Sequence, residues 1–358
     1  MMTMTIDRPH SLSAALGGPT LPNEVRSRLL AFEEIAVDAY APATLDLLQR
    51  TAMRFAGYLR SQNHKALPEK PEAIVGFIER LGAEQKPASV RAAVAALSTL
   101  YRAAGFEGAR NPTRSKLVAL ALRRLDRAKG TRQRQARPVY GPEMARMLAA
   151  CPHDLAGLRD RAMLTVMSAC LLRRSEVVAL RVGDVFRERD GTASVYIGRS
   201  KTDQTGDGAY APLNADETAK LTAYSAAAGL DPDDPEQTDA PLFRRVSSAG
   251  RLLDRPLSKH SITYLVRRAA ARAGLDEQVV AELTSHSLRR GAASEMLDAG
   301  VSALEIQQAG RWAGSSDMVS RYTNARTHRR DAAASRRALL DLRESSVIRP
   351  YRQQAEPA

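Results

Sequence analysis

The chain contains little cysteine, few aromatic residues and no long apolar run, and these shortages exclude whole classes of protein. Two cysteines in 358 residues, Cys151 and Cys170, cannot build a disulfide framework, and they fit a reduced compartment. No stretch approaches the roughly 18–20 uninterrupted apolar residues that span a bilayer. Residues 1–22 lack the charged-then-apolar pattern of an export signal. We therefore expect a cytoplasmic protein without a membrane partner.

Acidic residues are scarce relative to basic ones. The sequence has 40 Asp and Glu against 53 Lys and Arg, a formal net charge of +13. Nucleic acid is the natural partner of such a surplus, because each neutralised phosphate releases condensed counterions. A basic protein without a polyanionic partner is the alternative that composition alone leaves open.

Metal-ligand patterns are also missing from the sequence. The six histidines are scattered, and no dense carboxylate cluster has the spacing of metal ligands. We expect neither a metal nor a cofactor, and a metal-dependent nuclease is disfavoured.

Hydrophobic periodicity and composition divide the chain into two modules. Apolar positions recur at helical spacing over 43–59 and 90–104, with two further helices expected over 72–81 and 117–125. The alternation in 194–197 and the glycines of 206–208 predict a small antiparallel sheet within a second, α+β module. The expected domains are a flexible tail (1–21), an all-helical module (22–128), a basic linker (129–139), an α+β module ending in a docking helix (140–344) and a second flexible tail (345–358).

Five short motifs contain the candidate chemical groups. Arg173 precedes Ser175, a candidate helix cap, and Glu176. His286 and Arg289 are three residues apart and share one face of a helix start. The remaining candidates are a lysine in a predicted hairpin turn, the single tryptophan and a tyrosine ten residues after it: Lys201, Trp312 and Tyr322.

In this order, the five motifs resemble those of the tyrosine recombinase (phage integrase) family, and most closely the Cre-type recombinases. The resemblance covers most of the chain and is strongest over 155–201 and 284–323. It implies a mainly helical fold, with an N-terminal helical, SAM-like core-binding domain and an α+β catalytic domain. It also implies a site-specific recombinase that cleaves DNA through a 3′-phosphotyrosyl intermediate and proceeds via a Holliday junction, without metal or cofactor.

The chemistry of phosphate transfer explains why these residue types are needed. In-line attack adds charge to the non-bridging oxygens of a phosphodiester, and the guanidinium forks of Arg173 and Arg289 suit that charge. His286 and the indole N–H of Trp312 would complete the clamp, since an indole can only donate. The resemblance makes Tyr322 the nucleophile and Lys201 the general acid for the leaving 5′ oxygen. Glu176 would orient its neighbours, including His286.

Each residue also has an ordinary structural interpretation. A hairpin lysine such as Lys201 is usually solvated, and most tryptophans are half-buried core residues. Only the co-occurrence of all the motifs favours a catalytic function. One departure is that the interval from Trp312 to Tyr322 is one residue longer than is usual in the family. Tyr351, the only later tyrosine, lies in a polar C-terminal segment and is a poor substitute.

The resemblance also implies a clamp of the two modules around double-stranded DNA. A monomer in solution is expected to form a homo-tetramer on two short inverted-repeat sites in a bacterial cell, with the C-terminal helix docking into a neighbouring subunit. A helix packed on its own domain is the alternative for that segment. The candidate DNA contacts are Lys86, Arg91, Arg132, Arg134, Lys259, His260 and Arg267.

Two rival functions remain open from sequence. The first has the same chemistry with a different outcome, a relaxing topoisomerase or a telomere resolvase. The second is a DNA-binding protein of this fold that has lost catalysis, which the intact set of catalytic residue types disfavours.

Overall fold

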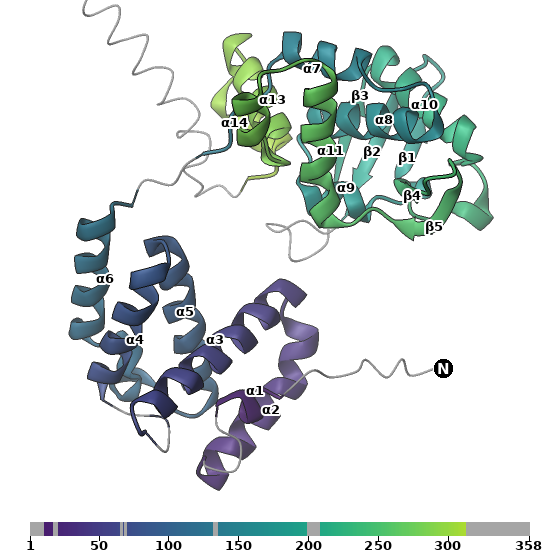
Figure 1. Ribbon diagram of the computed structural model, residues 1–358. Coiled ribbons are helices and arrows are strands. Elements are labelled where there is room, and N and C mark those ends of the chain that lie inside the picture. The colour runs from purple at the N-terminus through teal and green to yellow at the C-terminus, as the bar shows by residue number, and fades with distance from the viewer. Residues whose placement is uncertain are drawn as a thin grey trace, which may run out of the picture. The chain divides into compact units, whose positions relative to one another are not determined.

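The computed structural model describes residues 11–16, 21–64, 67, 70–131, 135–198 and 208–312. The chain divides into two compact units, Met1–Arg134 and Gln135–Ala358 (Figure 1). Within the described ranges no helix combines the length and the apolar character that crossing a bilayer requires. The docking helix expected at the end of the second module and the tail over 345–358 lie outside these ranges.

The first unit consists of helices. Proline occupies the first turn of three of them, where its fixed φ suits a helix start and its missing N–H costs nothing. Phe55 packs edge-on against Phe77 with ring centroids 5.0 Å apart, and both are buried. The elements are α1 (Leu12–Leu16), α2 (Asn23–Ala39), α3 (Pro42–Ser61), α4 (Pro71–Glu84), α5 (Pro87–Ala103), the 3-10 turns η2 (Gly108–Arg110) and η3 (Pro112–Arg114), and α6 (Lys116–Lys129).

The prediction of a flexible tail over 1–21 is wrong for its described residues. Leu12 and Leu16 of α1, together with Leu21, are buried in the core of the helical unit. Ser11 donates its hydroxyl hydrogen to Glu33 of α2 at 2.8 Å. A helix of five residues is too short to show a hydrophobic period, so the pattern that predicts the longer helices has no signal here.

The second unit combines helices with two small sheets. Its helices are α7 (Gly141–Ala149), α8 (Leu155–Ala169), α9 (Arg174–Ala179), α10 (Ala215–Ala228), α11 (Lys259–Arg272), α12 (Glu277–Glu282), α13 (His286–Asp298) and α14 (Ala303–Ala309), with the 3-10 turns η4 (Val182–Asp184) and η5 (Pro235–Gln237). Its strands are β1 (Val185–Arg187), β2 (Ala193–Ile197), β3 (Ala209–Leu213), β4 (Arg244–Val246) and β5 (Leu252–Pro256).

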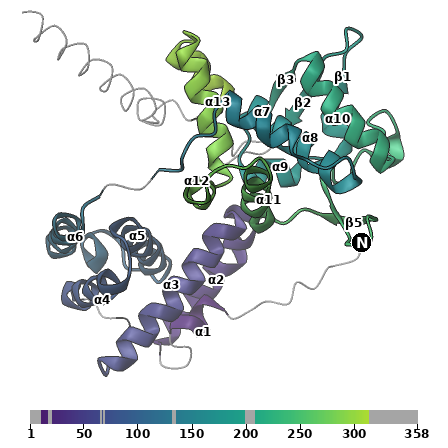
Figure 2. The same ribbon diagram turned by 45° about the horizontal axis from the view of Figure 1, so that its top comes forward.

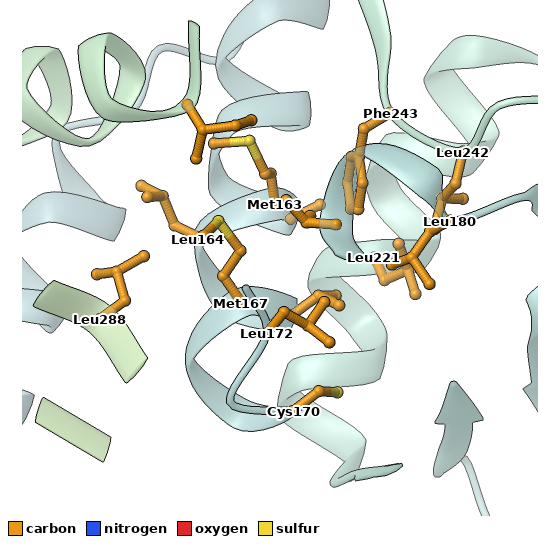
Figure 3. Packing of buried hydrophobic residues seen from close by; sticks show 14 of the residues in the cluster. Met163, Leu164, Met167, Cys170, Leu172, Leu180, Leu221, Leu242, Phe243 and Leu288 are labelled. Carbon is orange, nitrogen blue, oxygen red and sulfur yellow. The ribbon is translucent and has the colours of Figure 1, made fainter. Parts of the chain in front are cut away.

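Helix α8 forms the centre of the second unit. It contacts α7, α9, α10, α11 and α13, and both views show it among them (Figures 1 and 2). Met163, Leu164 and Met167 are fully buried along it, and Figure 3 shows them between Leu288 of α13 and Phe243. A helix that is apolar on most of its surface must be surrounded, which explains this central position.

The three-stranded sheet has the antiparallel order β1-β2-β3. Strand β2 buries alternate residues, because Ala193, Val195 and Ile197 face the core while Ser194 and Tyr196 do not. Lys201 belongs to residues 199–207, which lie between β2 and β3 and outside the described residues. The mainly helical fold with small antiparallel sheets confirms the expected fold class.

Residues 135–139 are part of the second unit, which corrects the expectation of a linker over all of 129–139. The N–H of Val139 donates to the Ser287 carbonyl at 3.1 Å, and Val139 is buried. Arg290 donates to the carbonyl of Ala136 at 2.6 Å. Gly291 makes this approach possible, since a Cβ there would lie 1.6 Å from the Val139 oxygen. At the other end, Lys129 is the last residue of α6.

Candidate active site

Arg173 lies at the start of α9, two residues after a left-handed residue that ends α8. Leu171 has φ +46°, and the Leu172 N–H donates back to the Met167 carbonyl at 3.0 Å, which closes the helix end. The N–H of Arg173 is capped by the carboxylate of Glu176 at 2.9 Å. Ser175 lies inside α9 and is not its cap, so that expectation is corrected.

Glu176 is the buried anion that holds this region together. Its side chain is 2% exposed and accepts from the Arg173 guanidinium at 2.6 Å and from Arg311 at 3.1 Å. Burial alone would raise the pKa of the carboxyl. The bonds from Arg173 and the charge of Arg311 outweigh burial, so the pKa lies below its ordinary value. Glu176 is therefore ionised at neutral pH and can orient both arginines.

Arg289 enters the same region from α13. It is 3% exposed and donates to the carbonyls of Leu171 and Gly310. Its guanidinium carbon lies 4.5 Å from the ring centroid of Trp312, a cation–π arrangement. Arg289 thus connects the end of α8, the end of α14 and the single tryptophan.

The end of α14 has the same geometry as the end of α8. Arg311 has φ +51°, and the Trp312 N–H donates back to the Gln307 carbonyl at 3.1 Å. Gly310 is required by close approach, because a Cβ there would lie 2.2 Å from the Trp312 ring. Among the described residues, three other than glycine have positive φ, and Leu171 and Arg311 are two of them. Such a conformation costs about 1 kcal/mol or more, so two strained helix ends meet at this site.

The assembled cluster has an excess of positive charge. In the described part of the chain it joins the guanidinium groups of Arg173, Arg289 and Arg311 with one carboxylate, that of Glu176. Arg173 and Arg311 are 138 residues apart in the sequence, yet both bond the Glu176 carboxylate. Arg289 and Arg311 both donate to the Leu171 carbonyl. An anion with several oxygens is the ligand that such a partly buried surplus of donors favours.

We expect His286, the first residue of α13, to titrate below its ordinary pKa in the DNA-free protein. Desolvation is the largest cause of the lowered pKa, followed by the charges of Arg289, Arg174 and Arg173. Glu176 opposes them. The folded protein favours the neutral ring. The contribution of His286 to the free energy of unfolding is therefore fully present above pH 6.5, the ordinary pKa, and it is lost as the pH falls through the folded pKa. Nearby protein atoms desolvate the ring only in part, because much of the His286 surface remains exposed to water, so this loss is small.

An NMR titration of the imidazole measures this pKa, with a His286→Gln protein to assign the signal. Unfolding at several pH values should show the wild type losing slightly more stability than His286→Gln below pH 6.5. A His286 pKa above that value in the DNA-free protein would contradict the expectation. Addition of duplex DNA should raise the pKa, because a bound phosphate offsets the neighbouring positive charges.

The other candidates are distributed over the two units. Lys201, Tyr322, Arg132 and Arg134 fall outside the described residues. Lys86 and Arg91 flank the start of α5, where Arg91 forms an ion pair with Asp126. Lys259 and His260 are exposed in the first turn of α11. Arg267, further along α11, donates to the carbonyls of Leu283 at 2.9 Å and Ala281 at 2.8 Å, so this conformation uses it to hold the segment before α13.

Known proteins share this sequence pattern. The model of the phage integrase family matches residues 138–329, more than half of the chain. The chain belongs to the phage integrase family. An integrase/recombinase XerD homologue from Selenomonas ruminantium is 33% identical over 272 residues, which cover 75% of this chain and 78% of that protein. The recombinase Cre of Escherichia phage P1 is 27% identical over 318 residues, covering 82% of this chain and 89% of Cre.

Solved structures of integrases and recombinases share the fold of this integrase. An XerH site-specific recombinase in a post-cleavage complex has a TM-score of 0.61 at 17% identity and covers 90% of this chain and 94% of its own. A lambda integrase dimer has a TM-score of 0.53 at 18% identity, and the match covers 88% of this chain and 81% of the lambda integrase chain. The chain is thus a member of the tyrosine recombinases, a family whose curated members are named as recombinases.

Motif reasoning overlooked one member of the cluster. Arg311 stands beside the single tryptophan in the sequence Gly310-Arg311-Trp312, and that position was its only signal. In the folded integrase it donates to Glu176 and to two carbonyls of the α8 end. The charge of the Glu176 carboxylate raises the pKa of the His286 ring, against the effect of the arginines. The orientation of His286 by Glu176 stays a prediction.

Proposed function

We propose that this recombinase cuts and rejoins duplex DNA by attack of the Tyr322 hydroxyl on a backbone phosphate. The observation that supports this most is the partly buried cluster of three guanidinium groups, of which those of Arg173 and Arg311 bond one carboxylate and that of Arg289 bonds neighbouring carbonyls. Its net positive charge suits the phosphorus centre, where in-line attack adds charge to the non-bridging oxygens. Preorganised donors for developing charge are usually the largest single contribution to such catalysis.

The described residues have distinct parts in this proposal. Arg173 and Arg289 would each donate to the phosphate, since a guanidinium is a planar fork with five N–H groups that suits the oxygens of an anion. Trp312 would donate its indole N–H, and its ring holds Arg289 by the stacking described above. His286, neutral in the free protein, would bond a non-bridging oxygen. Glu176 would keep Arg173 in place.

Two further residues would move protons and form the covalent link. Attack by Tyr322 would leave a 3′-phosphotyrosyl bond and a free 5′ hydroxyl, and Lys201 would protonate the departing 5′ oxygen. The phosphotyrosyl bond conserves the energy of the broken phosphodiester. A second 5′ hydroxyl can then reverse the reaction without ATP, which makes strand exchange through a Holliday junction possible.

The proposed partner is duplex DNA with short inverted-repeat sites, bound by four copies of the chain. The XerH recombinase in the similar structure is bound to a palindromic substrate. A lambda integrase tetramer bound to a Holliday junction has a TM-score of 0.50 to this chain. The formal net charge of +13 supports a DNA partner independently of these similarities.

Covalent trapping on nicked DNA that carries a candidate site tests the reaction. We expect a complex that resists denaturation and that forms in EDTA. A plasmid with two sites then tests the outcome, since a recombinase deletes or inverts the interval between them. Relaxation without deletion or inversion would indicate a topoisomerase, and hairpin ends would indicate a telomere resolvase. A complex that requires a divalent ion would overturn the metal-independent mechanism.

A further inference from the structure

Arg311 has a set of contacts that its position in the sequence does not explain. Its side chain is 10% exposed. It donates to the Cys170 carbonyl at 3.0 Å, the Leu171 carbonyl at 3.2 Å and the Glu176 carboxylate at 3.1 Å. Its own carbonyl accepts from the Arg173 guanidinium at 3.2 Å. Arg173, Glu176 and Arg311 therefore form a closed ring of hydrogen bonds.

We propose that Arg311 is a positioning residue for DNA cleavage, which holds the Arg173–Glu176 pair in the geometry that binds the scissile phosphate. This inference rests on the proposed function. Four protein acceptors surround the Arg311 guanidinium, namely the carbonyls of Ala309, Cys170 and Leu171 and the Glu176 carboxylate, so its bonds hold protein groups in place. It acts by fixing both ends of the segment from Leu171 to Glu176, from which Arg173 projects.

The backbone of Arg311 distinguishes this role from that of an ordinary helix end. A left-handed residue after a helix is normally glycine, since glycine has no Cβ to strain the backbone. Arg311 adopts φ +51° in spite of its side chain. A helix end that needed only the turn would be served better by glycine, so the side chain has to contribute something that the turn does not.

The position of Arg311 also connects the ring to the rest of the active site. Arg311 directly precedes Trp312, which stacks on Arg289, and it lies eleven residues before Tyr322. Arg289 donates to the Leu171 carbonyl, which also accepts from Arg311, and to the carbonyl of Gly310, the residue before Arg311. A displacement of Arg311 would therefore move Arg173 and Arg289 relative to each other.

Arg311→Gly and Arg311→Lys test the inference with the full-length protein on nicked DNA. Glycine accepts the left-handed backbone, so Arg311→Gly should fold and should bind DNA with unchanged affinity. We expect its rate of covalent complex formation at saturating DNA to fall roughly tenfold to a hundredfold, because misplacement of a catalytic group by about 1 Å has such effects. Lysine keeps one charge but not the fork, so Arg311→Lys should recover little of the rate.

Asn63→Gly is the matched control for the backbone change. Asn63 is the third described residue other than glycine with positive φ, at +56°, and it belongs to the helical unit, whereas the cluster belongs to the second unit. Its replacement should leave the cleavage rate unchanged. This control separates the loss of a guanidinium from the introduction of glycine at a left-handed position.

Cleavage of DNA with a methylphosphonate at the scissile position distinguishes positioning of Arg173 from a merely structural role, which would lower the cleavage rate equally on both substrates. This neutral linkage needs less positive charge, so the ratio of the wild-type rate to the Arg311→Gly rate should fall toward one. An Arg311→Gly protein that cleaves the normal phosphate as fast as the wild type would overturn the inference, as would an equal defect on both substrates. A wild-type protein that forms no covalent product overturns the proposed function first, and this inference with it.

Discussion

Replacement of Tyr322 by phenylalanine should abolish the covalent DNA complex. Phenylalanine keeps the ring and removes only the hydroxyl that would attack phosphorus. Loss of a nucleophile typically slows an enzyme by several powers of ten, so the rate should fall by more than roughly a thousandfold. DNA affinity should persist, because the guanidinium cluster proposed to bind phosphate is intact. Trapping on nicked DNA, combined with a gel-shift measurement of binding, separates the two effects.

Tyr351→Phe provides the matched control, since Tyr351 is the only tyrosine after Tyr322. It should form the covalent complex at the wild-type rate. The reverse result, with Tyr322→Phe active and Tyr351→Phe inactive, would mean that the longer interval after Trp312 displaces Tyr322 and that another phenol attacks. Mass spectrometry of the peptide linked to DNA would identify that residue directly.

Arg173→Lys should lower the cleavage rate by about 10²–10³-fold, although it keeps the positive charge. The guanidinium of Arg173 bonds Glu176 with one nitrogen and the Arg311 carbonyl with the other, which aims the whole fork. A lysine ammonium has no such fork and cannot hold both acceptors while it donates to a phosphate. Loss of one preorganised donor to developing charge costs roughly 3–4 kcal/mol. Single-turnover cleavage at saturating DNA measures this effect.

Arg174→Lys is the control for this substitution. Arg174 is adjacent in sequence and exposed, and lysine there preserves the charge near the site. Its rate should stay within about twofold of the wild type, as surface substitutions usually have small effects. Equal defects in the two proteins would indicate that general charge near the DNA, and not the fork of Arg173, is what matters.

Long periodic helices and the alternating strand were predictable from sequence. The apolar spacing that predicts helices over 43–59 and 90–104 corresponds to α3 and α5, and the alternation over 194–197 lies in β2. Helix α1 and the β4–β5 hairpin were not predictable. The former has five residues. The latter combines three arginines, an aspartate and a proline with Val246, Leu252 and Leu253, and its apolar residues do not alternate with polar ones. Both elements depend on tertiary contacts that local pattern does not encode.

The site was predictable only in part, for a similar reason. Arg173, Glu176, Arg289 and Trp312 could be selected because their motifs resemble those of a known family, and the structure brings them together. Motifs do not reveal which protein groups the side chains bind. The bond between Glu176 and Arg311 and the stacking of Trp312 on Arg289 both depend on two helix ends with a left-handed residue. Sequence rules expect glycine at such ends, so they did not predict these contacts.

The docking of residues 135–139 onto α13 has a practical consequence for chimaeric recombinases. Exchange of the helical unit between relatives requires a junction that leaves each folded unit whole. A splice after Val139 would import foreign residues where Ala136 and Val139 bond Arg290 and Ser287. The splice belongs between Gly130 and Arg134, after the end of α6. At the other end, the transplanted piece should begin ahead of Ser11, so that the leucines of α1 travel with the core that they fill.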